Sequence, residues 1–170
     1  MATIYHYFAP EEAQFLSSAF PQYVRALGSN FPSAILMFDG GSSDEEAYFK
    51  FQARGYPGAG NLTLDIYWRA DTATSGNIVF GAQVAAITPN TDSQDVLTKA
   101  FATAQTQQDT HLGTTAKRLH QVALTISNLD SLANDDIVWL KFYRDASDTV
   151  NDTLAGDAGP ELLRLSYSDT

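Results

Sequence analysis

Residues 61–69 read NLTLDIYWR, and the spacing of apolar side chains in this stretch decides the fold class. Large apolar residues stand at every second position, at Leu62, Leu64, Ile66 and Trp68, with mostly polar residues between them. Successive side chains of a β-strand point to opposite faces, so this alternation predicts a strand with one buried face. Turn-forming sequences flank it, GYPGAG at 55–60 and DTATSG at 71–76.

The same alternation recurs along the chain from about residue 34. It predicts further strands at 34–39, 46–53, 77–87, 120–127, 136–144 and 161–168. The strands at 61–69 and 77–87 are expected to form a hairpin with a loop at 70–76. Residues 92–110 favour a short helical turn that carries Val96, Leu97 and Phe101, followed by an edge strand rich in threonine and glutamine. About eight strands with almost no helix predict an all-β protein, an antiparallel sandwich or jelly roll.

The first 44 residues follow another pattern, and we expect them to form an N-terminal arm on a jelly-roll domain of residues 45–170. Pro10, Glu11 and Glu12 suit the first turn of a short amphipathic helix that ends at Pro21. The candidate anchoring residues of the arm are large and apolar: Phe15, Leu16, Phe20, Tyr23 and Phe31. An arm this apolar packs either on its own domain or on a neighbouring subunit or another protein.

Composition excludes several classes of partner. The chain has 170 residues, enough for one globular domain, and a formal net charge of -10. This charge repels phosphate and anionic lipid, so neither nucleic acid nor a membrane surface is an expected partner. The sequence contains no cysteine, which excludes disulfides and thiolate chemistry. MATIYHYFAP lacks the pattern of a signal peptide, and a soluble protein without an export signal is expected.

The acidic stretch 144–159, RDASDTVNDTLAGDAG, is the first place to look for a metal or catalytic site. The spacing of its aspartates, Asp145, Asp148, Asp152 and Asp157, does not match a calcium loop, and we interpret the stretch as a solvated connection whose aspartates form turns and caps. Of the three histidines, His6, His111 and His120, the last two are separated by nine residues, which is not a recurrent ligand spacing, and His120 is expected to be packed or at an edge. With no nucleophile or phosphate-binding motif either, we expect no catalytic residue, no metal, no cofactor and no enzymatic activity.

Four aromatic residues, Tyr48, Tyr67, Trp139 and Tyr143, fall on strand positions opposite to those of the expected core. Three interpretations remain open for them. Tyrosine and tryptophan are enriched in protein interfaces, and rings on an exposed sheet also stack on sugars. The third interpretation is that these positions face the core of a two-sheet fold. The four residues are therefore candidate interface aromatics.

Three blocks of the chain resemble small structural proteins of tailed phages and prophages. These are LTLDIYWRADTATSGNIVFGAQVAAI (62–87), RLHQVALTISNLDSLANDDIVWLKFYRDASDTVNDTLAGDAG (118–159) and LLRLSYS (162–168). The most specific parts are W-R-A-x-T-A-T-S-G-N and R-D-A-S-D-T-x-N-D-T-L-A-G-D-A. The resemblance covers about residues 45–170 and is to jelly-roll modules of the head-decoration, cement or fibre type.

This resemblance implies a non-enzymatic virion protein, commonly a homotrimer, that is made in the host cytoplasm. Its implied place is the capsid exterior, where it binds the major capsid protein lattice and stabilises the head. The N-terminal arm would then anchor it to the capsid or to an adjacent protomer. The alternative is a receptor-binding or glycan-binding module of a fibre or spike, with Trp139, Tyr143 and Tyr67 as stacking platforms.

Overall fold

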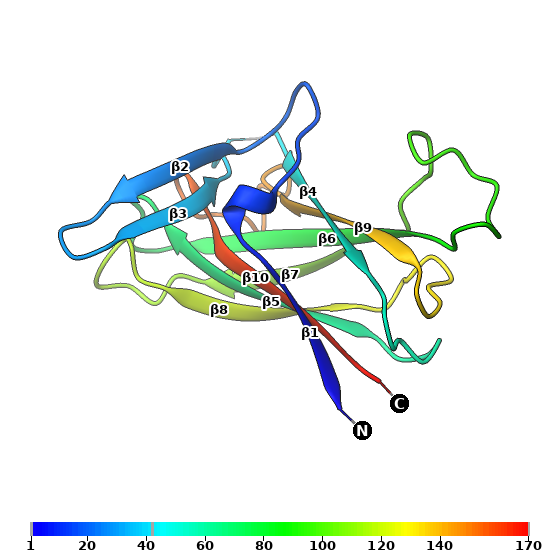
Figure 1. Ribbon diagram of the computed structural model, residues 1–170. Coiled ribbons are helices and arrows are strands. Elements are labelled where there is room, and N and C mark those ends of the chain that lie inside the picture. The colour runs from blue at the N-terminus through cyan, green and yellow to red at the C-terminus, as the bar shows by residue number, and fades with distance from the viewer. Residues whose placement is uncertain (1, 42, 170) are drawn as a thin grey trace.

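The computed structural model describes residues 2–41 and 43–169, and this part of the chain forms an antiparallel β-sandwich (Figure 1). Within it, sheet I has the strand order β1-β10-β5-β8 and sheet II has the order β4-β9-β6-β7, while β2 and β3 form a separate hairpin. The strands are β1 (Thr3–Phe8), β2 (Gln22–Leu27), β3 (Pro32–Met37), β4 (Glu45–Gln52), β5 (Leu62–Ala70), β6 (Asn77–Ile87), β7 (Gln105–Thr110), β8 (His120–Ile126), β9 (Ile137–Arg144) and β10 (Ala158–Ser168).

The register of the strands aligns the apolar positions into rows. In sheet I, Leu64 on β5 lies opposite both Leu124 on β8 and Leu165 on β10. In sheet II, Leu140 on β9 lies opposite Phe49 on β4. All five side chains are buried and belong to one hydrophobic cluster that joins the two sheets. The alternation predicted from the sequence therefore identifies the inner face of each sheet.

Trp68 links the two sheets at one end of this core. Its ring is fully buried on β5 and packs edge-on against Phe80 of β6, with 5.9 Å between the ring centroids. The ring also stacks on His120 of β8 at 4.3 Å, and its Nε1 donates a hydrogen bond to Asp109 of β7 at 2.8 Å. A buried indole needs such an acceptor, because an unpaired N–H would destabilise the core.

The strands predicted from 34–39 onward are confirmed as β3 to β10, but the predicted hairpin between 61–69 and 77–87 is wrong. β5 lies in sheet I and β6 in sheet II, so residues 71–76 carry the chain from one sheet to the other. β6 pairs with β7 along one side and with β9 along the other, which leaves it no free edge for β5. Alternation along one strand does not identify the strand that pairs with it.

The N-terminal region is less helical than expected. Within the described residues its helix is a single 3-10 turn, Pro10–Glu12, and no helix is long and apolar enough to cross a membrane. Thr3–Phe8 is strand β1, which pairs with β10 at the edge of sheet I. Phe8 enters the core, where its ring lies 5.2 Å from Phe49. The first eight residues are thus part of the sandwich, since pairing with β10 satisfies their backbone groups.

A buried ion pair ties the acidic stretch to the core. Arg144, the last residue of β9, is fully buried, and its Nε and Nη2 donate to the two carboxylate oxygens of Asp152 at 2.8 and 2.6 Å. The carbonyl oxygens of Leu154 and Gly156 also accept hydrogen bonds from this guanidinium, and Asp152 accepts another from the backbone N–H of Val79. The prediction of a solvated connection is therefore wrong for Asp152, because its carboxylate is the counter-charge of a core arginine.

Two buried histidines hold the turn that precedes β8. The Nδ1 atom of His111 accepts a hydrogen bond from the Gly113 N–H, and the Nε2 atom of His120 accepts one from the Leu112 N–H, both at 3.0 Å. A ring nitrogen that accepts a hydrogen bond carries no proton. The other ring nitrogen of His111, Nε2, lies 3.1 Å from the carbonyl oxygen of Ala116 and donates a hydrogen bond to it. Both rings therefore fit this turn in the neutral form, and His120 is packed, as the sequence predicted.

We expect Asp152→Asn to lower the free energy of unfolding by about 3–5 kcal/mol, because it leaves the Arg144 charge buried without its partner. Urea denaturation followed by far-UV circular dichroism would measure the change. Asp148→Asn is the matched control, since Asp148 hydrogen-bonds to Asn151 in an exposed turn of the same stretch. Equal stability of the two variants would contradict the assigned role of the ion pair.

Stability should fall as the pH drops below about 6.5. Burial, and secondarily the neighbouring His111, lower the pKa of His120 from 6.5, and burial also lowers the pKa of His6. The unfolded chain therefore takes up protons near its ordinary histidine pKa while the folded chain resists them, which favours unfolding in acid. Urea midpoints between about pH 7.5 and pH 5 would show the loss. His120→Gln, which keeps an acceptor for Leu112, should flatten the curve; an unchanged slope would exclude His120 as a source.

Candidate functional site

The outer face of sheet II carries rings and charges at neighbouring positions. On β9 the outward residues are Trp139, Lys141 and Tyr143, which alternate with the buried Val138, Leu140 and Phe142. The register places Lys141 opposite Tyr48 of β4. Tyr48, Trp139 and Tyr143 are each partly buried, as expected for rings that lie on a sheet and are covered by other segments.

Two irregular segments fold over this face and enclose a pocket. At the edge of β4, Gln14 and Tyr48 exchange backbone hydrogen bonds of 2.9 Å in each direction, which places residues 14–16 beside the sheet. On the other side, the Ala102 N–H donates to the Val84 carbonyl oxygen at 2.9 Å, and the Gln83 side chain donates to the Ala102 carbonyl oxygen at 2.8 Å. Ala102 is thereby held beside β6, next to the residues of this segment that line the pocket.

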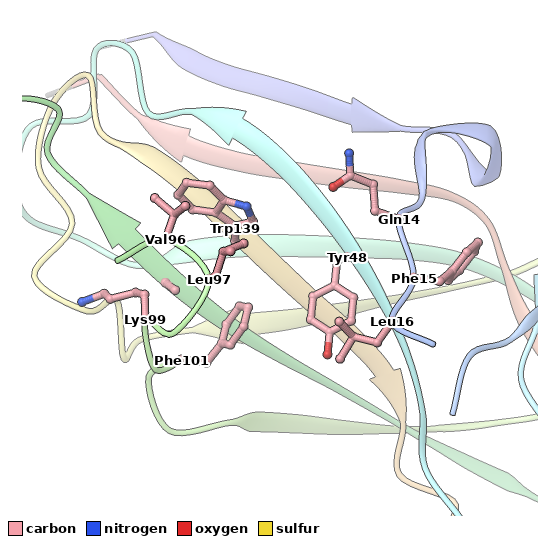
Figure 2. A pocket seen from close by; sticks show the side chains of 10 residues that line it. Gln14, Phe15, Leu16, Tyr48, Val96, Leu97, Lys99, Phe101 and Trp139 are labelled. Carbon is pink, nitrogen blue, oxygen red and sulfur yellow. The ribbon is translucent and has the colours of Figure 1, made fainter. Parts of the chain in front are cut away.

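The pocket between these segments has a volume of about 350 Å³. Figure 2 shows Trp139 and Tyr48 between the side chains of residues 14–16 and those of residues 96–101. The rings of Tyr48 and Phe101 lie 6.0 Å apart, and the Lys141 ammonium lies 5.6 Å from the Phe101 centroid. Four aromatic side chains from four segments therefore line one open pocket: Phe15, Tyr48, Phe101 and Trp139.

Charged groups around the pocket are paired with one another. Lys141 forms an ion pair with Glu46 at 3.0 Å, and Lys99 forms one with Asp130 at 2.9 Å. The Tyr48 hydroxyl donates a hydrogen bond to the same Glu46. Burial, followed by this hydrogen bond, raises the pKa of Tyr48, so its hydroxyl stays protonated at neutral pH. The pocket consequently offers no unbalanced charge to a ligand.

Two hydrogen-bonding side chains, the amide of Gln14 and the indole of Trp139, also line the pocket. Gln14 is exposed and Trp139 is partly exposed, so water can reach both. An exposed donor costs little in the free protein and can bind a ligand oxygen. The pocket therefore combines apolar ring surfaces with available polar groups. Among the described residues, no three His, Asp or Glu side chains are grouped in a way that could hold a metal ion.

The four candidate interface aromatics do not form one set. Tyr48 and Trp139 line the pocket, whereas Tyr143 lies over Gly81, where an added Cβ would come within 2.2 Å of the Tyr143 ring. Burial, with nearby carboxylates as a smaller cause, raises the pKa of Tyr143 to about 12. Tyr67 is on the outer face of sheet I, with its ring 5.8 Å from the Arg164 guanidinium. These positions share an alternation pattern, but the two sheets of a sandwich have separate outer faces.

The candidate anchoring residues all lie at the surface. Phe15 and Leu16 are at the edge of the pocket, and the Phe20 ring lies 5.9 Å from that of Phe15. Tyr23 and Phe31 belong to the β2–β3 hairpin and its turn, and Phe31 is 72% exposed. The structure thus separates the five residues into a pocket-edge group and a hairpin group, and their anchoring role stays a prediction.

The sequence did not identify Gln14, Leu97 and Phe101 as pocket residues. The signal for Leu97 and Phe101 was their apolar character in an otherwise polar segment, which we interpreted as one face of a helical turn. The observed turn is limited to residues 95–99, where the N–H groups of Thr98 and Lys99 donate to the Asp95 carbonyl oxygen. The apolar side chains pack toward the outer face of sheet II instead, and the sequence held no signal for Gln14.

The chain is similar to known proteins in fold but not in sequence. No protein-family model matches the chain, and no curated protein matches it. Among solved structures, it is similar to a carbohydrate-binding module specific for non-crystalline cellulose, with a TM-score of 0.48 and 6% identity over 91% of this chain and 85% of that one. It is also similar to a structure of carbohydrate-binding modules from the β-sandwich superfamily, with a TM-score of 0.43 and 8% identity over 96% of this chain.

A third similar structure is the enzymatically active domain of tailspike protein 4 from bacteriophage CBA120, with a TM-score of 0.39 and 8% identity over 95% of this chain. The chain spans 54% of the β-sandwich-superfamily structure and 19% of the tailspike structure. At these identities the likeness concerns the fold alone. The strands and their pairing in the described residues confirm the all-β antiparallel sandwich predicted from the sequence.

Proposed function

We propose that this protein is a non-catalytic glycan-binding module and that it binds a sugar chain in the pocket on the outer face of sheet II. The observation that carries the proposal is the joint lining of one open pocket by Tyr48, Phe101 and Trp139. These rings come from β4, the segment before β7, and β9, so the fold assembles a surface that none of those segments contains by itself.

The chemistry of this pocket suits a sugar. The faces of a pyranose ring expose C–H groups that carry partial positive charge, and these pack favourably on the negative face of an aromatic ring. Hydroxyl groups at the sugar edge can accept hydrogen bonds from the Trp139 indole and from the Gln14 amide. A ligand site of this kind needs mostly apolar walls and a few placed polar groups.

The electrostatics favour an uncharged glycan. Lys99 and Lys141, the cations nearest the rings, are already in ion pairs with Asp130 and Glu46. The chain as a whole carries a formal charge of -10, which repels anionic sugars. Neutral oligosaccharides are therefore suitable first probes.

Trp139→Ala should weaken binding of a neutral oligosaccharide at least about tenfold, which corresponds to ~1.4 kcal/mol, because it removes the largest stacking surface. A glycan array would identify the ligand, and isothermal titration calorimetry would measure its affinity for the wild type and the variant. Tyr67→Ala is the matched control, since Tyr67 is an outward ring on the opposite sheet. Absence of any glycan ligand, or equal weakening by the two substitutions, would contradict the proposal.

A second candidate function is docking on another protein, which is the role that capsid decoration would require. The observation that favours it is the exposure of apolar residues along residues 15–31, including Leu16 at 61%, Leu27 at 83% and Phe31 at 72%. Apolar surface of this extent commonly marks an interface. Under this proposal the partner is the major capsid protein or a second copy of the chain, as in a homotrimer on the virion surface.

The docking role predicts that Leu27→Ser combined with Phe31→Ser abolishes self-association or capsid binding while the sandwich stays folded. Both residues are exposed at the hairpin, so their loss should not disturb the core. Sedimentation velocity would measure self-association, and co-sedimentation with purified tailed-phage heads would measure capsid binding. A wild-type protein that is monomeric at all concentrations and stays in the supernatant would exclude this candidate. Deletion of the whole arm is unsuitable, because it would remove β1 from sheet I.

A further inference from the structure

A second pocket lies on the other side of the sandwich, between the β2–β3 hairpin and the outer face of sheet I. Its volume is about 490 Å³. Arg69 of β5 and Glu161 of β10 contribute the sheet side, and Ser33 and Phe31 contribute the hairpin side. Leu119, which precedes β8, lines it as well. None of the residues named for the pocket on sheet II takes part in it.

Two buried polar atoms of this pocket's lining residues lack a hydrogen-bond partner in the described chain. They are Nη1 of Arg69 and Oγ of Ser33. The Arg69 side chain is 6% exposed, and its Nε donates to Glu161, while its Nη1 has no partner. Buried donors of this kind are rare in folded proteins because burial without a partner costs stability. Two of them beside one pocket indicate a ligand that supplies the missing partners.

The charges around the pocket are balanced. Arg69 is paired with Glu161, and Lys117 at the pocket wall is paired with Asp71 at 3.0 Å. A carboxylate or phosphate ligand would lie close to Glu161 and would be repelled by it. An uncharged ligand with several oxygen atoms could accept from Arg69 and bond to Ser33 without this repulsion.

The apolar part of the lining limits the ligand further. Phe31 and Leu119 are largely exposed in the free protein, at 72% and 58%. A ligand that covers them must present C–H groups on one face and hydroxyl groups on its edge. A single sugar ring presents both kinds of surface.

We infer that the pocket under the β2–β3 hairpin is a second binding site, for a single uncharged sugar ring whose hydroxyl groups pair with Arg69 and Ser33. This inference does not rest on the glycan site proposed on sheet II, because the two pockets lie on different sheets and share no lining residue. Both unpaired atoms are covered by protein, so the ligand reaches them when the hairpin moves outward.

The hairpin is the element best suited to such movement. Within the described chain β2 pairs with β3 and with no other strand, whereas β3 continues into the Phe38–Ala158 bridge to β10. A strand that pairs along one side opens more readily than a strand inside a sheet. The turn at residues 28–31 can therefore open while β3 stays attached to the body.

Nuclear magnetic resonance titration with methyl glycosides of glucose, galactose, mannose and N-acetylglucosamine would test the inference. We expect at least one of them to shift the amide signals of residues 28–33 and the side-chain N–H signals of Arg69. Trp139→Ala should leave these shifts unchanged, which separates this site from the one on sheet II. Shifts confined to the sheet II pocket, or no shifts with any of the four sugars, would overturn the inference.

Ser33→Ala distinguishes a binding role from a structural role. It removes a buried hydroxyl that lacks a partner, so the free protein should unfold at the same or a higher temperature. The same substitution should weaken sugar binding by about tenfold, because the ligand loses one hydrogen bond in a buried site. Arg69→Lys, which keeps the charge near Glu161 but removes Nη1, should weaken binding likewise. Lower stability of Ser33→Ala with unchanged sugar binding would contradict the assignment.

Discussion

The buried pair of Arg144 and Asp152 is the interaction on which the arrangement of the two sheets depends. β9 ends at Arg144 in sheet II, and the chain must then cross to β10 in sheet I. The pair fixes the start of this crossing, and Asp152 also binds the Val79 N–H of β6. The connection leads into β10, which pairs with both β1 and β5 of sheet I. A charge pair buried this deeply is tolerated because backbone carbonyls satisfy the rest of the guanidinium.

Both candidate sites arise in the same physical way. Each lies on the outer face of a sheet, where a segment outside that sheet folds over outward side chains and leaves a pocket. In each pocket the nearby charges are already paired, as in Lys141–Glu46 on sheet II and Arg69–Glu161 on sheet I. The sheets supply rigid positions for the rings and the arginine, while the covering segments supply shape. The paired charges favour uncharged ligands. The rigidly placed side chains favour ligands that combine apolar and hydroxyl surfaces.

The sequence predicted local structure well where one face of a strand is buried and the other is not. The alternation in residues 61–69 identified β5 and the inward Trp68, and β4 and β9 were found in the same way. The sequence did not predict strands or strand pairings that depend on a residue far away in the chain. Thr3–Phe8 has a weak pattern and becomes a strand because β10 offers it an edge, and β5 does not pair with β6 because β7 and β9 occupy both sides of β6.

For the candidate site, the sequence by itself determined that Tyr48 and Trp139 fall on strand positions opposite to those of the expected core, because the side-chain period of a strand is two. The tertiary structure decided that these two rings share a pocket with Phe101 while Tyr67 and Tyr143 lie elsewhere. It also decided that Asp152, one of four similar aspartates, is the core partner of Arg144. Strand pairing and loop packing join residues far apart in the chain, and a local pattern contains no information about which distant residue will be opposite.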